Sequence, residues 1–360
     1  MKAAVLRETN TPLSIEDVTC GNPGPREVLV RTVAAGVCHS DLHFADGSYP
    51  YPLPSVLGHE SAGEVLAVGD AVSYVQPGDH VITCLSAFCG HCEHCITGHM
   101  SLCQEPELQR AADQPSRLSV GGEPVHQFLN LSSFAEQMLI HEHALVKVRK
   151  DMPLDRAALI GCGVTTGVGA VIHTAKVAPG ETVAVIGCGG VGLSAINGAA
   201  IAGAGRIIAI DMMPQKLELA RKFGATDTIN PNDGDPIEAI REMTGGGVHH
   251  AFEAIGLKVT TEQAFKMLQR GGTATIIGMI PVGTQIELHG PEFLMERKIQ
   301  GSNMGSNRFR VDMPRFVDFY LNGKLHLDDL ISRRIKLEEV NEGMDALKTG
   351  EVARSVIMFE

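Results

Sequence analysis

Four cysteines lie close together in this chain, and their spacing constrains its fold more than any other feature. They are Cys89, Cys92, Cys95 and Cys103. Four thiolates are the ligand number of a closed tetrahedral zinc site, which adds folding energy and leaves no open position. Iron–sulfur clusters also use four cysteines, but this spacing matches neither the bacterial nor the plant ferredoxin pattern. We therefore expect a structural zinc site.

A second set of candidate metal ligands is spread along the chain, at Cys38, His59 and Cys162. Two sulfurs and one imidazole leave a fourth position for water or substrate, as in catalytic zinc sites. Zinc held there would lower the pKa of a substrate alcohol, so that an alkoxide forms and passes hydride to a nicotinamide. The sequence thus predicts two zinc ions per subunit, one structural and one catalytic.

A glycine-rich motif follows in the second half of the chain. It consists of Gly187, Cys188, Gly189, Gly190, Val191 and Gly192. The motif follows a predicted strand, opens a predicted helix and precedes Asp211 at the end of the next strand, which is the context of dinucleotide binding. The helix N-terminus offers N–H groups to a pyrophosphate. Because Asp211 would accept ribose hydroxyls and repel a 2′-phosphate, the motif predicts NAD rather than NADP.

The charge balance narrows the class of partner. Among 360 residues, 42 acidic residues outnumber 30 basic ones, and the formal net charge is −12. This argues against nucleic acid or an anionic membrane and leaves a small-molecule substrate. Nine cysteines without a secretion signal suggest reduced thiols and a cytoplasmic location. The uncharged residues 182–205 contain seven glycines and fit a strand, turn and helix better than a membrane span.

The pattern of the chain changes near residue 160. Before it, short apolar runs between Gly/Pro turns predict a β-rich domain of antiparallel strands. After it, strands and helices are expected to alternate, at 183–186, 190–204, 207–210, 214–223, 236–244, 250–254, 260–268 and 273–277. This alternation is typical of an α/β fold with a doubly wound parallel sheet. We expect a catalytic domain over residues 1–160, a nucleotide-binding domain over 161–303, and a C-terminal segment, 304–360, that returns to the catalytic domain.

These features, in this order, resemble the zinc-dependent medium-chain dehydrogenase/reductases, and among them the alcohol dehydrogenases. The family's zinc signature is matched by Gly58, His59, Glu60, Gly63, Gly69 and Val72. The resemblance runs from Lys2 to the C-terminal motif at residues 350–354. It implies a GroES-like catalytic domain and a Rossmann domain that binds NAD, with the active site in the cleft between them.

The resemblance assigns roles around the second set of ligands, here called the open site. Cys38, His59 and Cys162 would hold the catalytic zinc, and Glu60 would lie beside the ion and bind it transiently. Asp41 would orient His59 through a hydrogen bond. The N-cap of a helix is the alternative role for Asp41.

Further roles concern the proton and the cofactor. Ser40 would take the proton of the substrate hydroxyl and pass it through the nicotinamide ribose to His43, a base that faces solvent. Cofactor contacts are expected from the glycine motif and from His39, Thr166, Asp211, Lys216 and Arg354.

The segment after Cys103, to about Phe128, resembles the long loop of the animal-type and glutathione-dependent enzymes, in a shortened form. Those relatives are usually dimers and the short-loop relatives tetramers, so a homodimer is expected and a homotetramer is the alternative. The glutathione-dependent enzymes hold the substrate carboxylate with a basic residue of this loop, for which Arg110 and Arg117 are candidates.

The expected function is that of an NAD-dependent zinc alcohol dehydrogenase, which oxidises alcohols reversibly to aldehydes or ketones. An apolar substrate site is expected from Leu85, Phe128, Leu129 and Met279, which favours primary aliphatic, aryl or terpenoid alcohols. S-hydroxymethylglutathione dehydrogenase or nitrosoglutathione reductase is one alternative. A non-catalytic zinc- and NAD-binding sensor is the other, and the presence of Ser40 and His43 argues against it.

Overall fold

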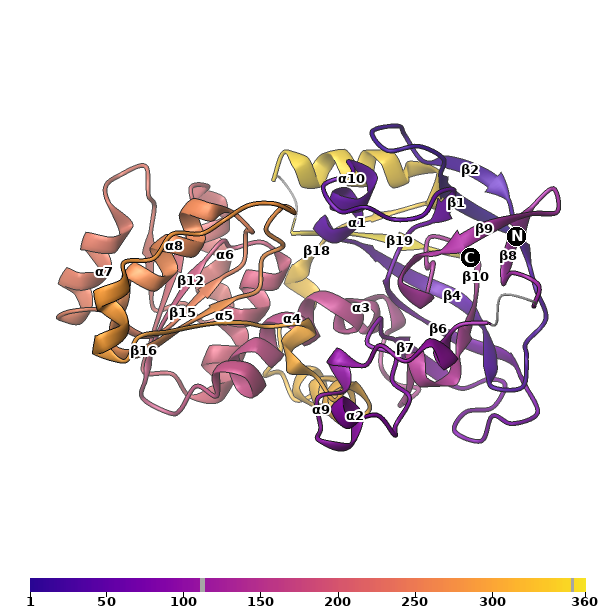
Figure 1. The fold of residues 1–360 in the computed structure, drawn as a ribbon, viewed down its shortest axis with the longest axis horizontal. Coiled ribbons are helices and arrows are strands. Elements are labelled where there is room, and N and C mark those ends of the chain that lie inside the picture. Colours follow the sequence, from indigo (N-terminus) through magenta and orange to yellow (C-terminus); the bar gives the residue numbers. More distant parts are fainter. Residues whose placement is uncertain (111–113, 351–352) are drawn as a thin grey trace. The chain divides into compact units, whose positions relative to one another are not determined.

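The computed structural model describes residues 1–110, 114–350 and 353–360. Residues 111–113 of the predicted long loop and 351–352 of the C-terminal motif lie outside the described residues. The chain forms two compact units (Figure 1). The first contains Met1–Cys162, Arg308–Asn322 and Leu327–Glu360, and the second contains Gly163–Asn307 and Gly323–His326. The chain therefore leaves the first unit after Cys162 and returns to it at Arg308.

Two sheets build the first unit. One has the strand order β2-β1-β5-β9-β8-β3. Its strands are β1 (Lys2–Leu6), β2 (Ser14–Asp17), β3 (Thr19–Cys20), β5 (Ser55–Val56), β8 (Leu118–Val120) and β9 (Glu123–Gln127). The other has the order β11-β7-β6-β4-β19-β18, and β10 also pairs with β4. Its strands are β4 (Glu27–Val37), β6 (Glu60–Val68), β7 (His80–Thr83), β10 (Gln137–His141), β11 (Leu145–Val148), β18 (Ile331–Ile335) and β19 (Arg354–Met358).

The pairings in these sheets are antiparallel except β5 with β9 and β18 with β19. This confirms the predicted β-rich domain, and the apolar runs of the sequence lie inside β4, β6 and β7. The helices of this unit are α1 (His39–Ala45), α2 (Glu93–Ile96), α3 (Leu154–Leu159), α9 (Phe309–Leu321) and α10 (Val340–Lys348).

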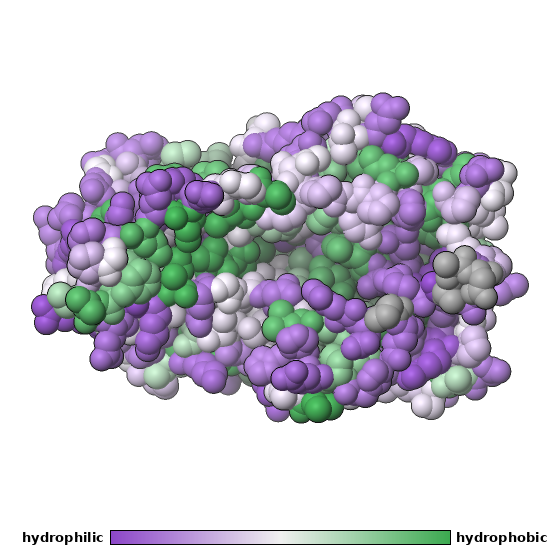
Figure 2. Space-filling model, in the orientation of Figure 1, coloured by the Kyte–Doolittle hydropathy of each residue, from purple (hydrophilic) through white to green (hydrophobic). Residues whose placement is uncertain are grey.

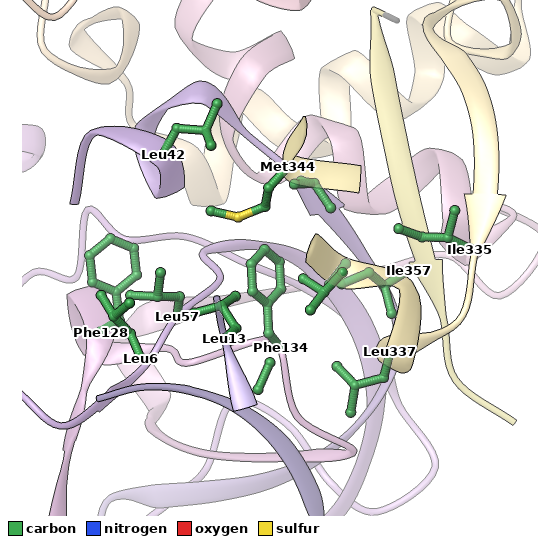
Figure 3. Close-up of a cluster of buried hydrophobic side chains, with 14 of the residues drawn as sticks. Leu6, Leu13, Leu42, Leu57, Phe128, Phe134, Ile335, Leu337, Met344 and Ile357 are labelled. Carbon is green, nitrogen blue, oxygen red and sulfur yellow. The ribbon is translucent and has the colours of Figure 1, made fainter. Parts of the chain in front are cut away.

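One buried cluster joins the two ends of the chain in the first unit (Figure 3). Leu6 of β1, Leu42 of α1 and Phe128 share this cluster with Met344 of α10 and Ile357 of β19. Burying a side chain of this size contributes about 1.5–3 kcal/mol. The C-terminal residues therefore complete the core that supports α1 and the segment around Phe128.

The second unit is built on a parallel sheet with the strand order β14-β13-β12-β15-β16-β17. The strands are β12 (Thr182–Ile186), β13 (Arg206–Ile210), β14 (Asp227–Ile229), β15 (Val248–Glu253), β16 (Leu268–Ile276) and β17 (Lys298–Gly301). The helices are α4 (Thr165–Gly169), α5 (Gly190–Ala202), α6 (Pro214–Lys222), α7 (Pro236–Thr244) and α8 (Lys258–Lys266). This strand order is that of the Rossmann fold, so the predicted doubly wound sheet is confirmed.

Sequence patterns located most of these elements closely. Helix α7 has the predicted bounds, and α5 ends two residues early because Gly203 adopts a left-handed conformation, with φ of 82°, and caps it. Strands β14 and β17 were not expected, because Asp227–Ile229 and Lys298–Gly301 each carry a single large apolar residue.

One helical stretch, Leu154–Ala175, is long and apolar enough to cross a membrane by composition alone. Its most apolar window is 83% buried inside the protein. Core helices of soluble proteins pass the same test of length and composition, so the stretch is weak support for a membrane span.

Candidate metal and nucleotide sites

Three side chains from distant parts of the sequence converge in the first unit. Cys38 directly precedes α1, His59 directly precedes β6, and Cys162 lies in a π-helical turn, Ile160–Val164. Their ligand atoms all lie within 4.8 Å of one another, and all three residues are buried. Gly161 makes this approach feasible, since a Cβ there would lie 2.9 Å from the Thr83 carbonyl oxygen. The structure thus brings together the predicted ligands of the catalytic zinc.

Asp41 fixes the orientation of the His59 imidazole. Its Oδ1 atom lies 3.0 Å from Nδ1 of His59, and its Oδ2 atom accepts a 3.0 Å hydrogen bond from the Cys38 N–H at the start of α1. The contact with His59 fits the orienting role. The N-cap position itself is Cys38, and Asp41 completes a capping box from the third helical position. The other imidazole nitrogen, Nε2, is buried and has no hydrogen-bond partner among the residues that the structure describes. An unpaired nitrogen beside two thiols fits a zinc ligand set.

The charges around this set act differently on the imidazole and on the thiols. Burial opposes protonation of His59, but the Asp41 carboxylate outweighs it and raises the pKa of the imidazole well above its usual value. The hydrogen bond from the Cys162 thiol, helped by the positive charge of Arg354 and opposed by burial, lowers the pKa of Cys38 well below its usual value. Cys38 is therefore the sulfur that most readily becomes a thiolate.

Arg354 and Glu60 form a buried ion pair beside these thiols. The Arg354 Nε atom lies 3.1 Å from Oε1 of Glu60, and Nη2 donates a 3.4 Å hydrogen bond to Sγ of Cys38. The exposed fractions are 4% for Arg354 and 0% for Glu60. We expected Arg354 to contact the pyrophosphate. The structure shows its guanidinium on Glu60 and Cys38, and the pyrophosphate contact stays a prediction.

Helix α1 carries the residues expected to move the proton. Ser40 is half-buried, and its Oγ atom accepts a 3.7 Å hydrogen bond from the Cys38 thiol. His43 is half-buried one helical turn further on, with its ring centroid 6.1 Å from that of Tyr49. His39 is exposed at the start of the helix. Because Ser40 and His43 are three residues apart, they share one face of α1.

The four-cysteine set also assembles. The sulfurs of Cys89, Cys92, Cys95 and Cys103 lie within 4.8 Å of one another. Backbone N–H groups of His91 and Cys92 donate to Sγ of Cys89 over 3.4 and 3.3 Å. Although burial raises it, these N–H groups lower the pKa of Cys89 to about 7. Cys89 also lies near His91 and Glu107, but this group shares its sulfur with the four-cysteine set and is not a separate site.

The glycine motif forms a tight turn between β12 and α5. A Cβ on Gly192 would lie 1.7 Å from the Gly187 carbonyl oxygen, so the turn closes only with glycine there. Helix α5 begins at Gly190, within the motif that also contains Val191, and no side chain of the described residues caps its N-terminus. A Cβ on Gly189 would meet nothing within 4 Å, which leaves open space in front of the helix. This geometry fits a pyrophosphate bound by backbone N–H groups.

Asp211 is tied to this turn. Its Oδ2 atom accepts a 2.8 Å hydrogen bond from the Cys188 N–H, and its Oδ1 atom accepts a 3.0 Å bond from the Met213 N–H. The carboxylate thereby lies at the carboxyl edge of the sheet, where dinucleotides bind in this fold. Lys216 is half-buried on α6, and Thr166 is buried on α4, with its Oγ1 3.3 Å from the Met304 sulfur.

Sequence reasoning missed two exposed apolar side chains at the same edge. Met212, directly after Asp211, is 62% exposed, and Ile255, just after β15, is 43% exposed. A Cβ on Gly187 would lie 2.5 Å from Cγ1 of Ile255, so this side chain lies over the glycine motif. Two apolar side chains here could cover the flat faces of a base. Their signal was an apolar residue placed directly after a strand end, but exposure cannot be read from a sequence.

The two arginines of the long loop are already paired. Nε of Arg117 lies 2.7 Å from Glu27 Oε1, and Nε of Arg110 lies 2.9 Å from the same atom. Of the residues expected around the substrate in the first unit, Phe128 is fully buried, while Leu85 and Leu129 are half-buried. Met279 is half-buried in the second unit.

Comparison with known proteins supports both units. Residues 24–150 match the family of the alcohol dehydrogenase GroES-like domain, and residues 190–322 match the zinc-binding dehydrogenase family. The chain is 40% identical to S-(hydroxymethyl)glutathione dehydrogenase of Photobacterium damsela subsp. piscicida over 99% of both chains. It is 36% identical to alcohol dehydrogenase 1 of Pisum sativum over 100% of this chain and 97% of that one.

A solved structure agrees with these matches. The crystal structure of benzyl alcohol dehydrogenase from Acinetobacter calcoaceticus has a TM-score of 0.94 and 34% identity, and it covers 100% of this chain and 99% of its own. Fold, metal-ligand clusters and full-length relatives therefore agree. The chain belongs to the zinc-dependent alcohol dehydrogenase family of medium-chain dehydrogenases, oxidoreductases that act on alcohols.

Proposed function

We propose that this protein oxidises apolar primary alcohols to aldehydes, reversibly and with NAD, at the site built by Cys38, His59 and Cys162. The observation that carries the proposal is the buried His59 Nε2 atom, which lacks a hydrogen-bond partner among the described residues and lies with two thiols within 4.8 Å. Three ligands leave one coordination position open for substrate.

The protein's own residues hold the site and move the proton. A zinc ion at this set would act as a Lewis acid that polarises the alcohol oxygen. Asp41 keeps Nε2 of His59 directed to the thiols, and Arg354 with Glu60 steadies Cys38. Ser40 accepts the proton of the substrate hydroxyl, and His43, on the same face of α1, releases it to solvent.

The four-cysteine set would hold a second zinc with a structural role, since four sulfurs leave no position for substrate. The turn at Gly187–Gly192 would bind the pyrophosphate of NAD, and Asp211 the adenosine ribose, with Met212 and Ile255 over the adenine. Asp211→Gly should raise the ratio of kcat/KM with NADP to that with NAD, because it removes the charge that repels a 2′-phosphate. An unchanged ratio would count against the ribose role.

Glutathione adducts are the second candidate substrates, because a relative of 40% identity is named S-(hydroxymethyl)glutathione dehydrogenase. The loop arginines argue against this choice. Both Arg110 and Arg117 pair with the buried Glu27 carboxylate, and every guanidinium nitrogen of the two already donates a hydrogen bond within the protein. Neither guanidinium is free to hold the glutathione carboxylate, which favours apolar alcohols.

We further propose a homodimer formed through the second unit. Strand β17 is an edge of the parallel sheet, so its outer N–H and C=O groups can pair with another copy. Val282, Phe293 and Leu294, in the segment between β16 and this strand, are 68%, 47% and 86% exposed, and Figure 2 shows apolar side chains gathered on this unit. Leu294→Asp should convert the dimer to a monomer in analytical ultracentrifugation. A cytoplasmic location stays a prediction, which the nine free cysteines support.

The central test is an initial-rate assay of NAD reduction with the zinc-loaded protein. The substrates are ethanol, longer aliphatic, benzylic and terpenoid alcohols, and S-hydroxymethylglutathione. We expect turnover of the apolar alcohols. Turnover of the glutathione adduct alone would favour the second candidate, and no turnover in a protein that holds both zinc ions would contradict catalysis. Ser40→Ala should abolish turnover but leave NAD binding intact, whereas Ser73→Ala, an exposed serine of the same unit, should change neither.

A further inference from the structure

The turn that follows β9 has an unusual backbone. Leu129, Asn130 and Ser132 have φ angles of 48°, 64° and 58°. These values lie in the left-handed region, which asparagine tolerates but a leucine side chain disfavours. Neighbouring contacts must therefore hold Leu129 in this conformation, and such strained residues are concentrated at functional sites.

The hydroxyl of Tyr51 supplies the main contact. It donates a 2.9 Å hydrogen bond to the Gln127 carbonyl and accepts a 3.0 Å bond from the Leu129 N–H. Burial raises the pKa of Tyr51, so the phenol stays neutral and can donate and accept at once. A second hydroxyl, that of Ser132, accepts from the Phe128 N–H over 2.8 Å and donates to the Val56 carbonyl over 2.7 Å. The Tyr51 hydroxyl thus bridges the two residues that flank Phe128.

This turn lies beside the open site. The Phe128 ring is fully buried and meets the His59 imidazole edge-on, with ring centroids 5.9 Å apart and an interplanar angle of 73°. The Tyr51 ring packs edge-on against the same phenyl ring at 5.1 Å, and Phe44 of α1 does so at 4.8 Å. The side chain of Leu129 stays half-exposed next to this aromatic layer.

The same turn is connected to the long loop through Gln127. The side-chain Nε2 of Gln127 donates to the Leu139 carbonyl over 2.8 Å, and its Oε1 accepts a 2.8 Å hydrogen bond from Arg117. Arg117 in turn pairs with Glu27. Gln127 is therefore held by its side chain on one side and by Tyr51 on the other, so a shift of the loop would move the turn.

We propose that Tyr51 is a positioning residue that sets the size of the alcohol the enzyme accepts. Its hydroxyl fixes the strained turn at residues 127–130, so that Phe128 and Leu129 form a rigid apolar wall beside His59. A bulky alcohol gains contacts with this wall, whereas ethanol is too small to use them fully. The proposal rests on the alcohol dehydrogenase function proposed above and adds the residue that shapes its substrate site.

The test compares Tyr51→Phe with Tyr320→Phe, which removes a hydroxyl 3.3 Å from the Asp328 carboxylate in the same unit. With Tyr51→Phe, KM for benzyl alcohol should rise about five- to tenfold, the effect of losing one or two hydrogen bonds. KM for ethanol, kcat and the zinc content should stay close to wild type, and Tyr320→Phe should change none of them. An equal rise for both alcohols, or no rise, would overturn the proposal even if the wild type is fully active.

A second measurement does not depend on turnover. Leu129→Gly accepts a φ of 48° without strain, so it removes the need for the Tyr51 hydroxyl. Tyr51→Phe should therefore lower the melting temperature clearly in the wild-type background and much less in the Leu129→Gly background. Equal decreases in both backgrounds would show that Tyr51 does not hold the turn. A wild type that oxidises no alcohol would contradict the proposed function, and the melting comparison would still decide the role of Tyr51.

Discussion

The two cysteine sites of this protein are built in opposite ways. The four-cysteine site takes all its ligands from one short segment, and two of the four residues, Cys92 and Cys103, are only half-buried. The three-ligand site gathers Cys38, His59 and Cys162 from segments far apart in the sequence, and all three are buried. A local, partly exposed site depends on its metal for order, whereas a buried site assembled from the core is already shaped by the surrounding fold.

The contacts to the ligand atoms differ in the same sense. In the four-cysteine site, backbone N–H groups of the loop itself donate to Cys89. In the three-ligand site, side chains from other elements, Asp41 and Arg354, contact His59 and Cys38. Mutations at the first site should therefore affect stability, and mutations at the second should affect catalysis.

The largest expected effect is on turnover. Cys162→Ala removes one ligand from the open site but leaves the core around it almost unchanged. We expect kcat to fall by at least about 10²–10³-fold, the loss seen when one contact that stabilises the transition state is removed. Zinc analysis should show one ion lost per subunit, with an unchanged circular dichroism spectrum. If this variant unfolded, the three-ligand site would not be shaped by the surrounding fold as we infer.

The matching substitution in the four-cysteine site is Cys95→Ala. It should lower the free energy of unfolding by about 3 kcal/mol or more, because a structural metal contributes folding energy directly. Urea denaturation measures this effect. Cys84→Ala, at a buried cysteine outside both sites, is the control for the loss of a thiol and should cost clearly less. If both variants are equally stable, the cluster does not hold a structural metal.

A third prediction concerns Glu27, which pairs with two arginines of the loop that follows the four-cysteine site. Despite burial, the hydrogen bond from Arg110, with further help from Arg117, lowers the pKa of Glu27 to about 2. The carboxylate is therefore stabilising above pH 4.5, and this stabilisation is lost as the pH falls towards 2. The shift corresponds to about 3 kcal/mol.

Stability should accordingly decrease below pH 4.5 in the wild type, and Glu27→Gln should flatten this decrease. Urea denaturation at a series of pH values between 2 and 6 checks it. A variant with the same slope as the wild type would show that Glu27 is not the group that titrates.

The smallest expected effect comes from Asp41, which supports the three-ligand site through His59. Asp41→Asn keeps the shape of the side chain but removes the charge that faces Nδ1 of His59. Zinc affinity at this site or turnover should fall about 10–100-fold, as is usual for partners of metal-ligating histidines. Competition with a chelator measures the affinity, and the four-cysteine site should retain its zinc. Loss of zinc from the four-cysteine site alone would contradict the role of Asp41 in supporting the three-ligand site.

Local patterns in the sequence predicted much of this molecule. The four cysteines and the glycine motif each lie within one short segment, so their spacing alone indicates a metal cluster and a phosphate-binding turn. The strands of both units begin near runs of apolar residues, because burial selects those residues. The contact of Asp41 with His59 was expected only from the family resemblance.

Contacts between distant residues could not be predicted from such patterns. Arg354 pairs with Glu60 across 294 positions of the chain, and Tyr51 holds Leu129 across 78. Nothing in the neighbourhood of either residue indicates its partner, since the contact exists only after the sheets have packed. The left-handed conformation of Leu129 is equally hidden, because leucine does not favour it and only its surroundings impose it.

The shared core of the two chain ends has a consequence for biosynthesis. Leu6 and Phe128 are covered by Met344 and Ile357, and Cys38 receives its hydrogen bond from Arg354. A ribosome therefore releases the residues of the open site long before the segment that completes them, whereas most of the Rossmann unit emerges without interruption. During translation the nucleotide-binding unit can fold first. The open site of the catalytic unit is completed only when β19, the last strand, has been synthesised.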